Sequence, residues 1–108
     1  MFRPSDDSGY RTVLEGVQLR TLVHGERTHM TQFLLARGAV VPTHAHPQEQ
    51  TGYLVSGRLD FTVAGEQVAA GPGDSWSIAG DVEHSAVALE DSVVLEVFSP
   101  VRQDYLDR

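Results

Sequence analysis

Apolar and polar residues alternate with a period of two along most of this chain of 108 residues. The clearest runs lie near residues 31–36, 58–63 and 93–98, and such alternation is typical of half-buried β-strands. Short, glycine-containing turn signals separate the runs, which indicates hairpins. We therefore predict about eight strands, near residues 17–23, 28–36, 51–55, 58–63, 67–70, 75–78, 85–89 and 93–99. An all-β fold, an antiparallel sandwich or barrel, accommodates this number of strands.

The length of the chain predicts a single domain, and no internal repeat or linker interrupts it. We assign residues 15–102 to the β domain, residues 1–14 to a loose N-terminal arm, and residues 103–108 to a C-terminal tail, either a helical turn or an extended arm. Hydrophobic residues make up 41% of the chain and charged residues 21%, which excludes a disordered protein. Without a bilayer-length apolar run or a signal peptide, we expect a cytoplasmic location and no membrane partner.

The charge and the cysteine content narrow the chemistry further. Eight arginines against fifteen acidic residues give a net charge of -7, which argues against a nucleic acid partner. The absence of cysteine excludes disulfides and thiolate metal sites. Any metal would have to be held by histidine, carboxylate or amide groups, so the five histidines become the candidates.

The pair His44 and His46 is the sharpest chemical feature of the sequence. Two residues apart on an extended segment, both imidazoles point to the same face and can chelate one ion. Gln50 offers an amide oxygen on the same face, and a closed antiparallel fold could bring His84 to the same place. The alternative is two solvated loop histidines, a solvated glutamine and a hydrogen-bonded histidine at the start of a strand.

The spacing around this pair resembles the first motif of the cupin superfamily. Intervals of five, one, three and six residues separate Gly38, His44, His46, Gln50 and Gly57. The segments from Gly71 to Asp74 and from Ile78 to His84 resemble the second motif, with Ala79 and Asp81 where proline and glycine are usual. The resemblance implies a cupin jelly-roll barrel over about residues 15–102. It also implies a divalent metal held by His44, His46, Gln50 and His84.

Gln50 stands where the cupin motif has a glutamate. The neighbouring Glu49 could be the ligand instead, but neighbours on an extended segment face opposite ways, and the motif spacing favours Gln50. Three imidazoles and one amide leave the +2 charge of the ion uncompensated, which favours an anionic substrate or a bound water of lowered pKa. These ligands suit Zn, Ni, Fe, Cu or Mn, so the identity of the metal stays open.

The end of the chain, from Val94 to Leu106, resembles one-domain cupins that include the pectin-degradation proteins, which linearise unsaturated uronates. The resemblance implies that Glu96, Phe98 and Arg102 line the pocket, with Glu96 in place of the aspartate of those relatives. Glu96 and Phe98 share one face of the last strand, and an acid between two apolar residues is not expected there for packing. The alternative is a Glu96 in water at a sheet edge.

Three classes of function follow. The leading hypothesis is a metal-dependent isomerase or tautomerase acting on a sugar acid or an oxo acid, in which Arg102 pairs the substrate anion and Glu96 moves a proton. The second is an Fe-dependent dioxygenase or a polyketide-type cyclase. The third is a non-catalytic barrel that binds a ligand through the metal.

Other residues are assigned smaller roles. We expect His24 and His29 to be solvated, and Trp76 and Tyr53 to belong to the core or to the pocket wall. The last strand has two apolar faces, with Val93, Leu95 and Val97 opposite Val94 and Phe98, and only one can face the core. We therefore expect a homodimer.

Overall fold

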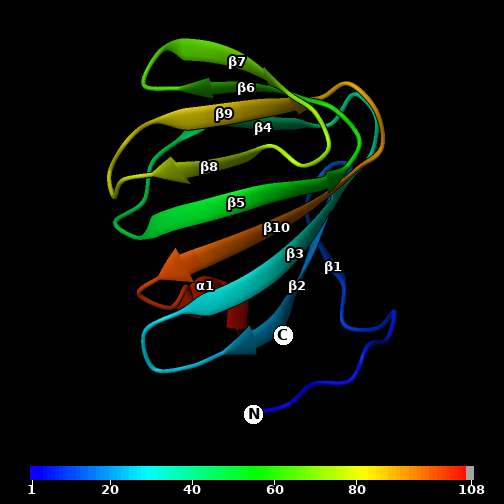
Figure 1. Ribbon diagram of the computed structural model, residues 1–108, viewed down its shortest axis with the longest axis vertical. Coiled ribbons are helices and arrows are strands. Elements are labelled where there is room, and N and C mark those ends of the chain that lie inside the picture. The colour runs from blue at the N-terminus through cyan, green and yellow to red at the C-terminus, as the bar shows by residue number, and fades with distance from the viewer. Residues whose placement is uncertain (107–108) are drawn as a thin grey trace.

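The computed structural model describes residues 1–106 and consists almost entirely of β-strands (Figure 1). The strands are β1 (Arg11–Leu14), β2 (Val17–His24), β3 (His29–Leu35), β4 (Val40–His44), β5 (Glu49–Ser56), β6 (Leu59–Val63), β7 (Glu66–Ala70), β8 (Ser75–Ile78), β9 (His84–Ala88) and β10 (Ser92–Ser99). They are followed by one helical turn, α1 (Gln103–Leu106). All eight predicted strands are present, so the all-β prediction is confirmed.

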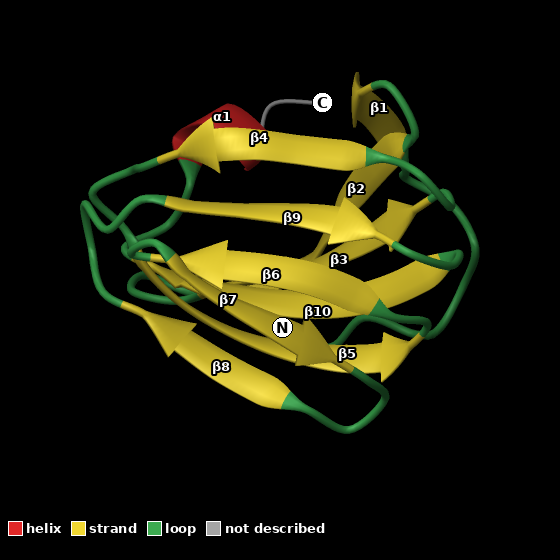
Figure 2. Ribbon diagram, turned by 90° about the horizontal axis from the view of Figure 1, so that it is seen from above, coloured by secondary structure: helices red, strands yellow, loops and turns green. Residues whose placement is uncertain are grey.

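Two antiparallel sheets face each other and form the jelly-roll barrel (Figures 1 and 2). One sheet has six strands in the order β1-β2-β3-β10-β5-β8, and the other has four in the order β4-β9-β6-β7. Apolar side chains from both sheets fill the space between them, among them Leu54, Leu59, Ile78 and Val94. Burial of this apolar surface is the main force that holds the sheets together. Within residues 1–106, α1 is the one helix, and four residues are too few to cross a membrane.

Strands β1 and β4 were not predicted. The segment Arg11–Leu14 lies in the expected loose arm, but it pairs with β2, so the arm boundary at residue 14 is wrong. A four-residue strand at a sheet edge carries too little alternation to stand out. Strand β4 contains Pro42, which lacks a backbone donor and lowers the strand signal. The structure tolerates Pro42 because β4 is at an edge of the four-stranded sheet.

The two ends of the chain are fastened to the six-stranded sheet. Before β1, the Arg20 guanidinium donates hydrogen bonds to the carbonyls of Asp6 and Ser8, at 2.7 and 3.0 Å. After β10, the residues of α1 adopt the helical alternative for the tail, and the Arg11 side chain donates to the carbonyls of Asp104 and Tyr105. Residues 107 and 108 of the predicted tail lie outside the described part of the chain.

Alternation along β10 decides which side chains enter the barrel. Val94, Glu96 and Phe98 are buried on the inner face, whereas Val93, Leu95 and Val97 are partly exposed. Cross-strand register places Gln50 of β5 and His29 of β3 on either side of Phe98. In the next row, Gly52 and Thr31 flank Glu96. These two rows of the six-stranded sheet carry Gln50, Glu96 and Phe98 of the candidate site.

Candidate metal centre

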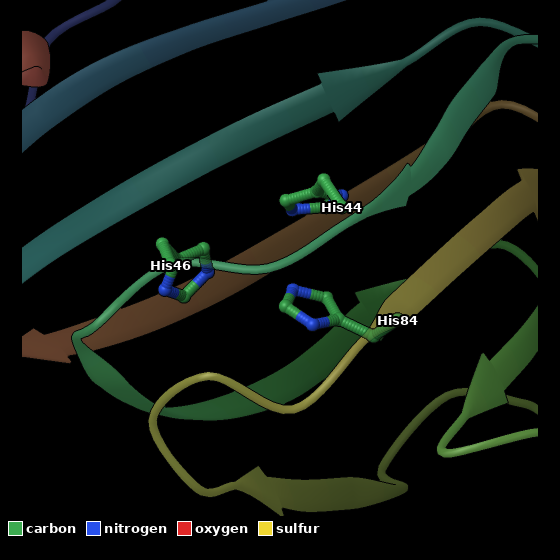
Figure 3. A group of neighbouring side chains, drawn as sticks. All are labelled: His44, His46 and His84. Atoms are coloured by element: carbon green, nitrogen blue, oxygen red, sulfur yellow. The ribbon is translucent and has the colours of Figure 1, made fainter.

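Three histidines from distant parts of the chain meet between the two sheets (Figure 3). His44 ends β4 and His84 begins β9, and the two are direct partners in the register of these strands. His46 lies two residues beyond β4, on the connection to β5. One ring nitrogen from each histidine lies within 4.8 Å of the others. Figure 3 shows the three rings turned toward a common space.

The turn before β9 brings His84 to this place. Asp81 has a φ of 66°, a left-handed conformation that asparagine and aspartate tolerate better than most residues, and the cupin motif has glycine there. Its N–H donates to the carbonyl of His46 at 2.7 Å. A Cβ atom on the neighbouring Gly80 would overlap the carbonyl of Pro47. The turn therefore packs directly on the His46 segment, which explains the glycine at position 80.

Each of the three imidazoles is oriented by a backbone carbonyl. The Nδ1 atoms of His44, His46 and His84 bond to the carbonyls of Pro42, Gln48 and Val82 at 2.8, 3.0 and 2.8 Å. A carbonyl can only accept, so Nδ1 carries the proton and Nε2 keeps a lone pair. The Nε2 atoms of His46 and His84 are buried and have no hydrogen-bond partner. Burial also lowers the pKa of His46 and of His84, which favours the neutral form that a metal requires.

Gln50 offers a further donor atom to the cavity that the three histidines line. The alternation along β5 buries Gln50 and exposes Glu49, as expected from their opposite faces. The Gln50 amide nitrogen donates to Glu96 Oε2 at 3.0 Å, and its Oε1 is buried without a partner. Gln48 Oε1 is likewise buried and unpartnered, but Gln48 does not line the cavity that the histidines share with Gln50. Three lone-pair nitrogens and one amide oxygen fit a divalent transition metal.

The Glu96 carboxylate lies next to this cluster and away from water. β10 is bonded on both sides, to β3 and β5, and Glu96 is 6% exposed, so the alternative of a solvated edge position is wrong. Its two oxygens accept hydrogen bonds from Gln50 and from the Trp76 indole N–H, the latter at 3.1 Å. Burial raises the pKa of Glu96 to about 7, although both hydrogen bonds favour the ionised form. Such a carboxyl can gain and lose a proton near neutral pH.

Gly52 makes room for this contact. It lies between Trp76 and Glu96 in the cross-strand row, and a Cβ atom at position 52 would overlap the indole ring. The indole therefore crosses over Gly52 to reach the carboxylate.

Arg102 forms the other side of the site. Its guanidinium donates to both oxygens of Asp104, at 3.1 and 2.8 Å, and lies 4.0 Å from the centre of the Tyr105 ring. The hydrogen bonds from Arg102 hold the pKa of Asp104 below its ordinary value. The Phe98 ring contacts both Arg102 and His46: its centre lies 5.1 Å from the guanidinium carbon of Arg102 and 5.7 Å from the centre of the His46 ring. A cation is thus held in a fixed position beyond the histidine cluster.

All seven residues singled out from the sequence line one cavity. Most of the other lining residues are apolar. The lining consists of Phe33, Leu35, Val41, His44, His46, Gln50, Leu59, Phe61, His84, Ser85, Ala86, Val94, Glu96, Phe98, Arg102 and Tyr105. The structure thus joins the two motifs and the chain end into one site, in which the histidines, Gln50, Glu96 and Arg102 share the cavity with mostly apolar side chains.

Sequence reasoning misplaced two residues near the site and missed the roles of two others. His29, expected in water, is fully buried, and the expected core or wall residue Tyr53 is 47% exposed on the outer face. His29 has the same parity as Phe33 and Leu35 on β3, a signal that could have placed it inside. Trp76 was expected in the core or wall, but its bond to Glu96 was not foreseen, nor was the pairing of Asp104 with Arg102. His24 is exposed, as expected.

Comparison with known proteins agrees with this geometry. The profile of the cupin domain matches residues 31–99. The pectin degradation protein KdgF of Dickeya dadantii (strain 3937) is 26% identical over 103 residues, which is 94% of each chain. The structure of KdgF from Halomonas sp. is 35% identical and superposes with a TM-score of 0.88, covering 92% of each chain. An RmlC-like cupin from Shewanella frigidimarina NCIMB 400 is 25% identical with a TM-score of 0.92, covering 97% of this chain and 95% of the other.

Proposed function

Because the chain belongs to the cupin domain family, we propose that it is a metal-dependent enzyme that isomerises a small anionic sugar acid. The substrate we favour is an unsaturated uronate, in keeping with the similarity to two proteins named KdgF, one of them a pectin degradation protein. The observation that carries the proposal is the buried Glu96 carboxyl, whose pKa of about 7 suits it to accept and return a proton beside the histidine cluster.

The reaction needs one movable proton and no redox change. The ring oxygen of an unsaturated uronate is attached to a carbon–carbon double bond. When the anomeric hydroxyl loses its proton, the bond from the anomeric carbon to the ring oxygen breaks, which leaves an aldehyde and an enolate. A proton added to the enolate carbon then gives the ketone, so substrate and product are isomers. In our proposal Glu96 moves this proton.

The remaining residues bind and orient the substrate. The metal would be held by the Nε2 atoms of His44, His46 and His84 together with Gln50 Oε1. A bound divalent ion supplies Lewis acidity that stabilises negative charge on an oxygen. Arg102 would pair the substrate carboxylate, and its contacts with Asp104 and Tyr105 keep its side chain in place before the substrate arrives. Phe98 would pack against the sugar ring from the wall of the cavity.

The proposal is tested with purified, metal-loaded protein and an unsaturated uronate released by a pectate lyase. Turnover removes the conjugated double bond, so its ultraviolet absorbance should fall at a rate proportional to the amount of protein. Glu96→Ala should lower that rate by roughly 10²- to 10⁴-fold. Metal content is measured on each sample, so that loss of rate is not mistaken for loss of metal.

Glu49→Ala is the matched control, because Glu49 is an exposed acid on the same strand as Gln50. It should leave the rate unchanged. A metal-loaded wild-type protein that leaves the absorbance unchanged would overturn the proposed reaction. Full activity in Glu96→Ala would overturn the role of Glu96.

The apolar interior of the cavity supports a second candidate. Phe33, Phe61 and Val94 offer no polar group to a sugar, and they suit the flat apolar rings of an aromatic substrate. This lining favours the Fe-dependent dioxygenase or polyketide-type cyclase among the classes raised by the sequence. Oxygen uptake by the iron-loaded protein with an aromatic acid would support it over the isomerase. Tight binding of the uronate without any turnover would instead support a metal-anchored binding barrel.

We also propose a homodimer formed through the outer face of the six-stranded sheet. Leu95 lies at the centre of this face, paired with Gln32 and Tyr53 on the two neighbouring strands. Met30 is 39% exposed and Tyr53 47% exposed on the same face, and isolated subunits rarely leave so many apolar side chains uncovered. Light scattering should give twice the chain mass of 11.8 kDa, and Leu95→Arg should give the monomer mass. A wild-type monomer at micromolar concentration would overturn this proposal.

A further inference from the structure

His29 is a fully buried histidine that belongs to neither cupin motif. It lies on the inner face of β3, 0% exposed, with its ring 6.3 Å from the ring of Phe98. Both ring nitrogens have partners. Nδ1 faces the backbone N–H of Arg102 at 3.2 Å, and Nε2 faces the Thr21 hydroxyl at 2.8 Å. One side chain therefore connects the β2–β3 hairpin to the segment that carries Arg102.

Counting donors determines the protonation state of the ring. The Thr21 hydroxyl has one hydrogen, which it donates to the carbonyl of Tyr105 at 3.2 Å. It must then accept from His29, so Nε2 carries a proton. The backbone N–H of Arg102 can only donate, so Nδ1 must accept. These contacts are satisfied together by one species alone, the neutral imidazole with its proton on Nε2.

Other groups hold the same segment, but among residues 1–106 His29 is the side chain that bonds the Arg102 backbone. Asp104 and the Tyr105 ring hold only the guanidinium, and Arg11 bonds carbonyls further along α1. We propose that neutral His29 is a positioning residue, which fixes the backbone of Arg102 through Nδ1 and so keeps the Arg102 side chain at the wall of the cavity. The inference rests on the proposed function where it takes Arg102 as the group that binds the substrate anion.

Acid should release this contact. A protonated ring would point Nδ1–H at the Arg102 N–H, which brings two donors together. The charged and titratable groups around the ring are His24 on β2, Arg102, and Asp104 on α1. Burial lowers the pKa of His29, and His24 and Arg102 lower it further, while Asp104 acts in the opposite direction. The ring is therefore neutral at pH 7, and the Arg102 segment should loosen only in more acid solution.

Two substitutions separate the two hydrogen bonds of the ring. Asparagine places its side-chain oxygen close to the position of Nδ1, so His29→Asn keeps an acceptor for the Arg102 N–H. Glutamine reaches the position of Nε2, so His29→Gln keeps the contact with Thr21 and loses that acceptor. A purely structural role for a buried side chain would make both variants similar in effect.

The first measurement needs no substrate. In the metal-loaded protein at about pH 7.5, nitrogen NMR of the wild-type ring should show the Nε2–H tautomer. Hydrogen exchange at the Arg102 amide should be about tenfold faster in His29→Gln than in wild type, and in His29→Asn within about threefold of it. The Nδ1–H tautomer, or equal exchange in wild type and His29→Gln, would overturn the inference.

The second measurement is the affinity for D-galacturonate, a saturated uronate that cannot undergo the reaction. Wild type should lose affinity in acid before it loses metal, His29→Asn should lack this loss, and His29→Gln should bind weakly at every pH. The control at neutral pH is His24→Asn. The exposed His24 ring lies edge-on to the His29 ring, with 6.1 Å between ring centres, but within the described residues its one side-chain hydrogen bond is to the adjacent carbonyl of Gly25 and none reaches the Arg102 segment. This variant should bind like wild type at neutral pH. A wild-type protein that does not bind the uronate would count against the proposed function, while the exchange rates would still decide the role of His29.

Discussion

Replacing Glu96 with glutamine should weaken metal binding, although Glu96 is not a member of the histidine cluster. In wild type the Gln50 amide nitrogen donates to Glu96, which turns the Gln50 oxygen away from Glu96 and leaves it free as a ligand. The other oxygen of Glu96 accepts from the Trp76 indole. A carboxylate can accept from both donors at once, but a glutamine at this position has only one oxygen.

The side chain introduced by Glu96→Gln must place its amide group against one of the two donors. The Trp76 indole N–H can only donate, so the new oxygen should face Trp76. The new amide N–H then faces Gln50, which can accept only by turning its own oxygen inward and its NH₂ group toward the histidines. Loss of this kind of orienting contact typically lowers metal affinity by about 10- to 100-fold, or about 1.4 to 2.8 kcal/mol.

The assay is competition for Zn²⁺ against a fluorescent chelator at about pH 8, where a carboxyl with a pKa of about 7 is mostly ionised. Trp76→Phe removes the indole donor, so in the double variant the new glutamine can again offer its oxygen to Gln50. The double variant should therefore bind zinc within about threefold of Trp76→Phe alone, because the ligand orientation is restored. Glu49→Gln makes the same change of charge at an exposed neighbour and should bind like wild type.

Two results would refute this reasoning. Unchanged zinc affinity in Glu96→Gln would show that the orientation of Gln50 does not depend on Glu96. Equal weakening in Glu96→Gln and in the double variant would show that the lost negative charge matters and the amide orientation does not.

Further predictions follow from other contacts of the site. His84→Ala should abolish stoichiometric zinc binding in equilibrium dialysis, whereas His24→Ala should not, and retention of one ion by His84→Ala would exclude His84 as a ligand. Gly52→Ala should push the Trp76 indole off Glu96 and lower the free energy of unfolding by about 1 to 3 kcal/mol, measured by urea denaturation. A midpoint of urea unfolding equal to that of wild type would contradict this. Burial lowers the pKa of His46 and His84 below the ordinary value of about 6.5, so zinc should stay bound at about pH 6.5 and be released only in stronger acid. One zinc ion per chain still bound at about pH 4 would contradict this.

Period-two alternation was sufficient to predict eight of the ten described strands and the inward side of β10. Because side chains on a strand alternate between faces, the buried Val94 and Phe98 already placed Glu96 inside, and the same rule separated Gln50 from Glu49. The same method did not predict strand β4, because Pro42 interrupts its alternation of apolar and polar residues. An edge strand can nevertheless accommodate a proline. His44 was thus predicted as a metal ligand, although the strand that ends at this residue was not predicted.

Contacts between strands far apart in the chain could not be predicted in this way. The bond of Trp76 to Glu96 depends on their register through β5 and on the missing side chain of Gly52, and alternation within one strand contains neither. The burial of His29 depends on Phe98 of β10 and on the backbone of Arg102, which cover the first residue of β3. The sequence shows the face on which a residue lies but not what covers that face.

The candidate ligands do not all belong to one sheet. His44 is the last residue of β4 and His84 the first of β9, both in the four-stranded sheet, whereas Gln50 belongs to the six-stranded sheet. An ion bound by all of them would therefore join the two sheets at one end of the barrel. The opposite end, packed around residues such as Leu54 and Ala88, has no share in that link. Loading the protein with metal should therefore stiffen the barrel unevenly. Protection of backbone amides from hydrogen exchange should rise steeply near the histidines and hardly at all at the opposite, apolar end of the barrel.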